Sequence, residues 1–121
     1  LPTLIRDGIT KKKIQIIISQ DSTKDYIHIN DVIKIIFKIL KHGKSDIYNV
    51  ASGNNISIKK IVQILKKKLN CKVILKNQNK KVFEPKINVS RIREEFKFRS
   101  KLNIKKDLPV LIKKFNKKFK S

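Results

Sequence analysis

The chain has 121 residues, of which 40% are hydrophobic, and a formal net charge of +22 at pH 7. This length supports one small domain with a modest core, and the apolar content argues against global disorder. No apolar run is long enough to cross a bilayer and no secretory signal is visible, so a cytoplasmic location is the default expectation. The single cysteine, Cys71, excludes an internal disulfide and any zinc site built from several cysteines.

The first third of the sequence predicts an alternation of helices and strands. The expected elements are a helix over Leu1–Ile9 with Pro2 in its first turn, a strand over Ile14–Ser19, a polar turn over Asp21–Lys24, a strand over Asp25–Ile29 and a helix over Asp31–Lys41. The continuous apolar run of the first strand predicts burial on both faces. We expect Asn30-Asp31 to cap the second helix, its many apolar residues to make it largely buried, and Gly43 to end it in a left-handed conformation.

The remaining two thirds contain strong signals for helix starts. The expected elements are a strand over Asp46–Ala51, a turn over Ser52–Asn55, a helix capped by Ser57 and running to Leu69, a strand over Cys71–Leu75, a basic loop over Asn77–Lys81, a helix over Ser90–Phe96 and a final helix capped by Asn103 or begun near Pro109. Apolar residues of the Ser57 helix recur at helical spacing, and its lysines lie largely outside that stripe. We therefore expect these lysines to face solvent.

The large positive charge has two explanations. A balance of this size is typical of proteins that bind nucleic acid or another polyanion. However, the chain contains 27 lysines but only 4 arginines, together with 22 isoleucines and one alanine. Lys, Ile and Asn are the residues that A/T-rich codons favour, and a codon bias explains the excess of isoleucine, which nucleic-acid binding does not. We therefore favour codon bias over a role in polyanion binding, and nucleic acid is not the expected partner.

Three blocks of sequence carry a more specific signal. Lys24 to Val32 is similar to an Arg-Asp-aromatic-aliphatic-His-Val-x-Asp-Val motif, and Ile47 to Gly53 is similar to a Tyr-Asn-Val-Gly-Ser-Gly motif. From Asn88 the chain matches Asp-x-Ser-Lys and then, at Glu95-Phe96-Lys97-Phe98, Glu-Leu-Gly-aromatic. In this order the blocks resemble the extended short-chain dehydrogenases/reductases that modify nucleotide sugars, the NAD-dependent epimerases and dehydratases.

The resemblance implies an α/β fold that corresponds to the C-terminal substrate-binding portion of such an enzyme, with the whole of residues 1–121 as that domain. The family's N-terminal Rossmann domain is absent from the sequence, since three glycines cannot form its fingerprint and no Tyr-x-x-x-Lys pair occurs. The start at Leu1, without methionine, also suggests a piece of a longer protein. NAD or NADP would then be bound by the parent enzyme and not by this chain alone.

The resemblance also implies a site for the nucleotide diphosphate. Lys24 occupies the position of the family's arginine, so it keeps the charge but loses the bidentate hydrogen-bonding fork. The loop residues Lys80 and Lys81 are candidates for a second basic contact, with a solvated loop as an equally good explanation. The implied partners are a nucleotide sugar, the Rossmann domain and a second copy in a homodimer, with no membrane.

Other side chains invite a chemical role but have structural explanations. His28 could act as an acid or base, although a structural hydrogen bond is the better interpretation. Asp31 is expected at a helix N-terminus, where the helix dipole favours a carboxylate. Tyr48 is expected to pack, and Cys71 to be inert.

Two functional alternatives stay open beside the substrate-binding portion of an epimerase, dehydratase or reductase. They are a basic nucleic-acid-binding module and a degenerate, non-catalytic interaction protein. On the main interpretation the chain binds the nucleotide diphosphate-sugar but has no turnover by itself.

Overall fold

The computed structural model describes residues 1–120, which form two compact units from interleaved segments. The first unit combines Leu1–Thr23 and Ser57–Phe83 with the chain from Asn103 onward. The second unit combines Lys24–Ile56 with Glu84–Leu102. Each unit is described below by itself.

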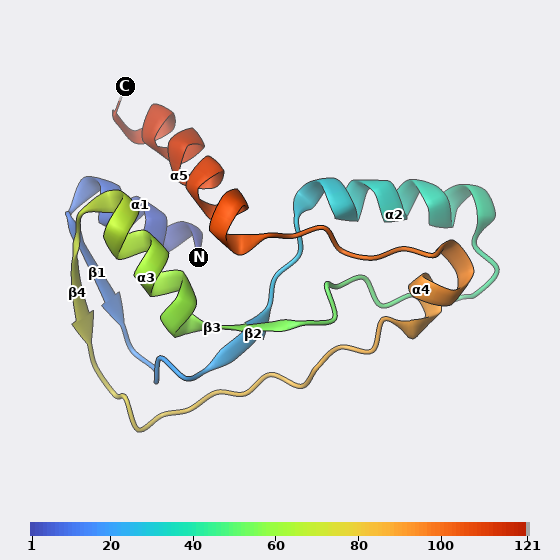
Figure 1. Ribbon diagram of the computed structural model, residues 1–121, viewed down its shortest axis with the longest axis horizontal. Helices are drawn as coiled ribbons and strands as arrows, with labels where there is room; N and C mark the ends of the chain where they lie inside the picture. Colours follow the sequence, from blue (N-terminus) through green and yellow to red (C-terminus); the bar gives the residue numbers. More distant parts are fainter. Residues whose placement is uncertain (121) are drawn as a thin grey trace. The chain divides into compact units, whose positions relative to one another are not determined.

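The first unit contains three helices and a pair of parallel strands. Its elements are α1 (Pro2–Thr10), β1 (Lys13–Ile16), α3 (Ile58–Leu69), β4 (Lys72–Leu75) and α5 (Ile104–Lys120). The strands β1 and β4 lie side by side and pair in parallel, with Ile14 opposite Val73 (Figure 1). Helix α1 contacts β1, α3 and α5, so the apolar sides of all three helices meet in one core. Ile5, Ile14 and Leu65 are fully buried in this unit.

Helix α3 follows the sequence expectation closely. The Ser57 hydroxyl accepts a hydrogen bond from the Lys60 amide at 3.3 Å and so caps the first turn. Ile61, Leu65 and Leu69 are buried at helical spacing, while the lysines on the other side of the helix are exposed. The expected solvated lysine face is therefore confirmed. The final helix agrees as well, since Asn103 precedes α5 and its side chain accepts from the Lys106 amide.

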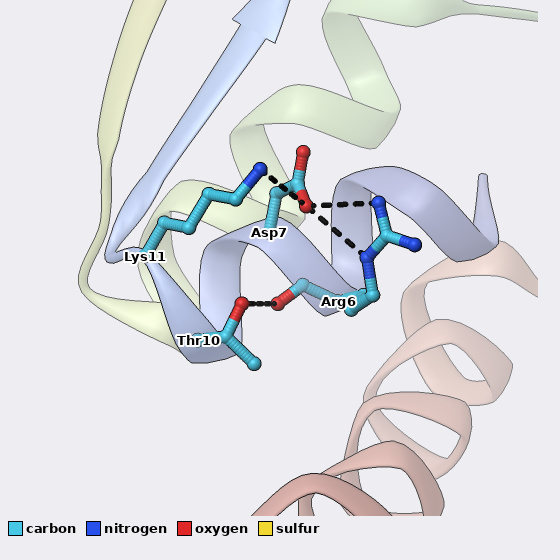
Figure 2. Close-up of polar contacts among 4 residues, drawn as sticks. All are labelled: Arg6, Asp7, Thr10 and Lys11. Atoms are coloured by element: carbon cyan, nitrogen blue, oxygen red, sulfur yellow. Dashed lines mark hydrogen bonds and ion pairs between the residues drawn. The ribbon is translucent and has the colours of Figure 1, made fainter.

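The carboxylate of Asp7, on α1, contacts two basic side chains (Figure 2). The Arg6 guanidinium donates to Asp7 Oδ1 at 3.2 Å, and the Lys11 ammonium lies 3.3 Å from the same oxygen. Partial desolvation alone would raise the pKa of Asp7, but the contacts with Lys11 and Arg6 outweigh it and lower that pKa. The other side of α1 is buried, and there a Cβ on Gly8 would come within 2.5 Å of Leu69 Cδ1.

The second unit is built on two helices and most of a short two-stranded sheet. These elements are α2 (Ile29–His42), α4 (Ser90–Phe96), β2 (Thr23–Asp25) and β3 (Asn55–Ser57), with β2 paired to β3. Its core comprises Ile35, Ala51, Val89, Ile92 and Phe98. The Asp31 carboxylate, 3% exposed, accepts from the Ser100 hydroxyl and from the Lys101 amide at 2.8 Å. Asp31 thus lies in the first turn of α2, as expected, and also holds the segment that follows α4.

Several sequence expectations at the start of α2 are wrong. The second strand ends at Asp25 instead of Ile29, and α2 begins at Ile29. His28, not the Asn30-Asp31 pair, is the N-cap, because its Nδ1 accepts a hydrogen bond from the Asn30 amide at 3.0 Å. Asn30 and Asp31, the expected capping residues, lie inside the helix instead. The structural interpretation of His28 fits this contact.

The burial expected for two elements is also wrong. β1 ends at Ile16 and alternates between exposed and buried residues, so only one face of the strand is covered. Helix α2 buries only Asp31 and Ile35. Val32 and Ile39 are half-buried, and the remaining large apolar side chains of α2 are exposed.

Two backbone expectations fail as well. Gly43 has φ −65°, so α2 does not end in a left-handed glycine. Among the described residues, the strand expected over Asp46–Ala51 is absent. This segment has the composition of a strand but no neighbouring strand with which to pair.

A hydrogen-bond network joins the segment after α2 to α4. The Tyr48 hydroxyl accepts from the Lys44 and Ser45 amides and donates to the Glu95 carboxylate. The Ser45 hydroxyl donates to the other oxygen of that carboxylate. The hydrogen bond from Ser45, followed by that from Tyr48, lowers the pKa of Glu95. The Tyr48 ring also lies 5.9 Å from that of Phe96, so the packing role expected for Tyr48 is combined with a polar one.

Replacing Lys97 by glycine should stabilise the second unit. Lys97 ends α4 in a left-handed conformation with φ 52°, at the position where the resembling Glu-Leu-Gly-aromatic motif has glycine. A left-handed residue with a side chain costs about 1–2 kcal/mol, of which the greater flexibility of unfolded glycine offsets part. We expect Lys97→Gly to raise the free energy of unfolding by roughly 0.5–1 kcal/mol in urea titrations. A matched Lys101→Gly variant, outside any left-handed turn, should be neutral or destabilising, and equal gains in both variants would contradict the explanation.

The Glu95 network should make stability depend on pH. Because the pKa of folded Glu95 is lowered, its contribution is fully present above the unfolded value of about 4.3 and is lost as pH falls through the folded value. Tyr48→Phe removes one donor to the carboxylate and the acceptor of two amides, so it should cost about 1 kcal/mol at pH 7. Urea unfolding of both proteins at neutral and acidic pH should show this cost shrinking towards pH 3. A cost that stays constant over this range would assign the effect of Tyr48 to packing and to its hydrogen bonds with the two amides, and not to Glu95.

Candidate functional site

Lys24 lies at the surface of β2, next to a firmly held residue. Its side chain is 57% exposed. The carboxylate of the adjacent Asp25 accepts from the Ser52 amide at 2.9 Å and from the Gly53 amide at 2.8 Å. Gly53 has φ 78°, and a Cβ there would lie 2.8 Å from Val89 Cγ2. The turn that receives Asp25 therefore requires glycine, and it fixes the backbone that carries Lys24.

Lys24 is already paired with a carboxylate. Its Nζ lies 3.4 Å from Glu84 Oε1, and the Glu84 side chain is 42% exposed. The Asn55 side-chain amide donates to the Glu84 carbonyl at 2.7 Å and anchors the backbone of Glu84 to β3. Among the described residues, Asn55 Oδ1 is the only buried side-chain N or O atom without a hydrogen bond. Lys24, Glu84 and Asn55 thus form one polar cluster on the second unit.

Tyr26 borders this cluster. Burial raises the pKa of Tyr26, an effect that the charge of Lys24 opposes and that of Glu84 reinforces. The phenol therefore keeps its proton at neutral pH and is a hydrogen-bond donor. The sequence interpretation did not single out Tyr26, although it follows Asp25 directly in the first block.

Lys80 and Lys81 lie in the first unit, in the loop after β4. The Lys80 carbonyl accepts from the Ser19 amide at 2.8 Å, and the Lys81 ammonium lies 4.0 Å from Asp21 Oδ2. Gln78 holds the loop further, because its side chain bonds the main chain of Ile18 and Gln20. Both lysines are exposed. Since Lys24 belongs to the other unit, the three predicted site residues form no common cluster within either unit.

Glu84 and Asn55 were missed by sequence reasoning. They stand 29 positions apart, and no local pattern brings them together. The one available signal is Pro85, which favours an extended backbone at Glu84 and so a side chain that projects from the loop.

Three other features of the described part of the chain bear on function: metal ligands, membrane spans and the single cysteine. Residues 1–120 contain no group of three or more His, Cys, Asp or Glu side chains placed to hold a metal ion. None of the described helices has the length and apolarity that a membrane span needs. Cys71 is buried, which raises the pKa of its thiol and agrees with the inert role expected for it.

Comparisons with known proteins identify the fold. A novel NAD-dependent NDP-hexosamine 5,6-dehydratase, TunA, involved in tunicamycin biosynthesis, matches 96% of this chain with a TM-score of 0.83 and 16% identity. A dTDP-glucose 4,6-dehydratase from Bacillus anthracis, solved in complex with NAD, matches 96% of it with a TM-score of 0.78 and 17% identity. The chain covers 39% and 38% of those two proteins. Its fold is thus the C-terminal part of an extended short-chain dehydrogenase/reductase.

Sequence comparison then gives the family. The model of the GDP-mannose 4,6 dehydratase family matches residues 3–118, and the chain belongs to this family of NAD-dependent epimerases and dehydratases. A dTDP-4-dehydro-6-deoxyglucose reductase from Escherichia coli is 38% identical over 63 residues, which are 51% of this chain and 20% of that enzyme. The chain therefore spans well under half the length of these relatives. The family predicted from the three sequence blocks is confirmed.

Proposed function

We propose that this chain is the substrate-binding portion of an NAD(P)-dependent enzyme that modifies a nucleotide sugar, and that Lys24 contacts the diphosphate of that substrate. The observation that carries the proposal is the position of Lys24, an exposed ammonium on a strand whose next residue is fixed by two backbone hydrogen bonds. A fixed backbone places the charge without the entropy cost of ordering a loop. Family membership supplies the substrate class.

The chemistry of the reaction belongs to the rest of a longer protein. Similar structures were solved with NAD or NADPH, and this chain spans about two fifths of their length. We infer that NAD or NADP is bound by the part of the protein that this chain does not contain. Alone, the chain would bind the nucleotide diphosphate but would not move a hydride. Lys80 and Lys81 remain candidates for a further contact with the anion.

Binding of uridine diphosphate tests the role of Lys24. We expect Lys24→Gln to weaken binding roughly fivefold to tenfold at low salt, because one charge-assisted contact is lost. The measurement is a titration followed by backbone amide NMR shifts of residues 24–26, which report on this site despite the many other lysines. The same sample, supplied with a nucleotide sugar and NAD, should show no nicotinamide reduction.

Lys59→Gln is the matched control for that experiment. Lys59 is exposed on α3 and is not part of the cluster, so this substitution removes an equal charge elsewhere. If both variants weaken binding equally, the anion is attracted by net charge alone, which would favour the polyanion-binding alternative. Turnover by the isolated chain would overturn the assignment as a binding portion.

Helix α2 carries an exposed apolar stripe, and we propose that a part of the protein outside this chain covers it. Its members are exposed and recur at helical spacing: Ile29, Ile33, Ile36, Phe37 and Leu40, between 45% and 75% exposed. Ile47, in the segment expected to be a strand, is 72% exposed as well. Contiguous apolar surface of this kind marks an interaction site. Because the chain spans about two fifths of similar structures, we propose that the preceding part of the longer protein covers the stripe.

Substitution of Phe37 tests this assignment. Phe37 is 59% exposed in this chain, so Phe37→Lys should change the free energy of unfolding by less than about 0.5 kcal/mol in the 121-residue protein. In the longer protein the same change should cost about 3 kcal/mol, because the ring would be buried. Val110→Lys is the control, since Val110 is exposed on α5, outside the stripe. Equal small effects of Phe37→Lys in both proteins would show that the preceding part does not cover α2.

A further inference from the structure

The Lys24 ammonium faces a carboxylate that no known role explains. Within the described part of the chain, seven of the nine acidic side chains accept a hydrogen bond or form an ion pair. Most of these satisfy backbone amides, cap a helix or join segments. Glu84 and Asp21 differ, because each carboxylate contacts only the charged end of one exposed lysine, and the Glu84 contact is the shorter of the two at 3.4 Å. An ion pair between two exposed side chains contributes little to stability, so the fold has no strong need of it.

We propose that Glu84 competes with the ligand for the Lys24 ammonium, so that a phosphate must displace the Glu84 carboxylate in order to bind. This inference rests on the proposed function, in which Lys24 contacts a diphosphate. Glu84 is a positioning residue in this scheme: it orients the ammonium in the empty site and sets how strongly the site attracts anions.

The geometry allows this displacement without unfolding. Asn55 holds the Glu84 carbonyl, and Pro85 restricts the Glu84 backbone to an extended conformation. The main chain therefore stays in place while the side chain, which is 42% exposed, can rotate into solvent. After rotation the carboxylate still lies near the bound phosphate and repels it, so both the displacement and the residual repulsion lower affinity.

The consequence is that removing the carboxylate should improve binding. Glu84→Gln keeps the size of the side chain and its polar character but frees the ammonium. We expect uridine diphosphate and inorganic pyrophosphate to bind about threefold to tenfold more tightly to this variant at low ionic strength, with the gain shrinking as salt screens the charges. Substrates with a single negative charge should gain less, because the repulsion by the Glu84 carboxylate grows with the charge of the ligand.

The experiment is a double-mutant cycle on the full 121-residue chain, with wild type, Glu84→Gln, Lys24→Gln and the double variant. Affinities for both probes are measured by calorimetry, and amide NMR shifts of residues 24–26 report on the local site. Glu94→Gln is the matched control, because Glu94 is exposed on α4 and its replacement changes the net charge equally. Thermal unfolding of each variant verifies that the fold is kept.

Tightening by Glu84→Gln that exceeds the control and disappears in the Lys24→Gln background supports the inference. An equal gain in the Lys24→Gln background, or in Glu94→Gln, would reduce it to a general charge effect and overturn it. Weaker binding by Glu84→Gln would show that Glu84 assists the ligand and would also overturn it. If Lys24→Gln itself leaves binding unchanged, the proposed role of Lys24 fails, which is a result distinct from the other outcomes.

Discussion

The carboxylate of Asp25 is the contact on which the second unit and its candidate site depend. It accepts two consecutive backbone amides, from Ser52 and Gly53, and so joins the end of β2 to a turn that lies far along the sequence. A carboxylate that accepts two amides is held more strongly than either hydrogen bond alone would hold it. Asp31 plays a similar part, because its carboxylate accepts from the Ser100 hydroxyl and from the Lys101 amide. Acidic side chains thus join parts of the unit that lie far apart in the sequence, in a chain with only nine of them.

The sequence predicted best where a single side chain decides the local structure. Ser57 caps α3, Asn103 precedes α5, and the buried stripe of α3 follows its apolar spacing. These features depend on contacts within four residues, and such contacts are visible in a linear pattern. The family was predictable for a related reason: its motifs coincide with turns and caps, whose geometry tolerates few residue types.

The failures in burial and in strand formation concern partners that a local pattern cannot show. The apolar composition of α2 predicted burial, but burial requires a second surface, and the described chain does not supply one for Phe37 or Leu40. The segment Asp46–Ala51 has the residues of a strand, but strands form only beside another strand. In both cases the pattern predicts a contact that the described part of the chain does not make.

The candidate site shows how composition and geometry combine. Because the chain has 27 lysines, a positive charge alone does not identify a binding site. A lysine becomes a candidate only where its neighbours fix its position. Lys24 stands out because a clamped neighbour fixes its backbone and because Glu84, one of nine acidic residues, is placed against it. A bias towards lysine codons explains an abundance of ammonium groups, but it does not place a scarce carboxylate beside one of them.

A codon bias that favours lysine also lowers the number of arginines. A lysine at the diphosphate contact loses the bidentate geometry that makes arginine selective. An adjacent carboxylate occupies that ammonium and repels an incoming anion in proportion to the anion's charge, so Glu84 limits how strongly the lysine attracts a diphosphate.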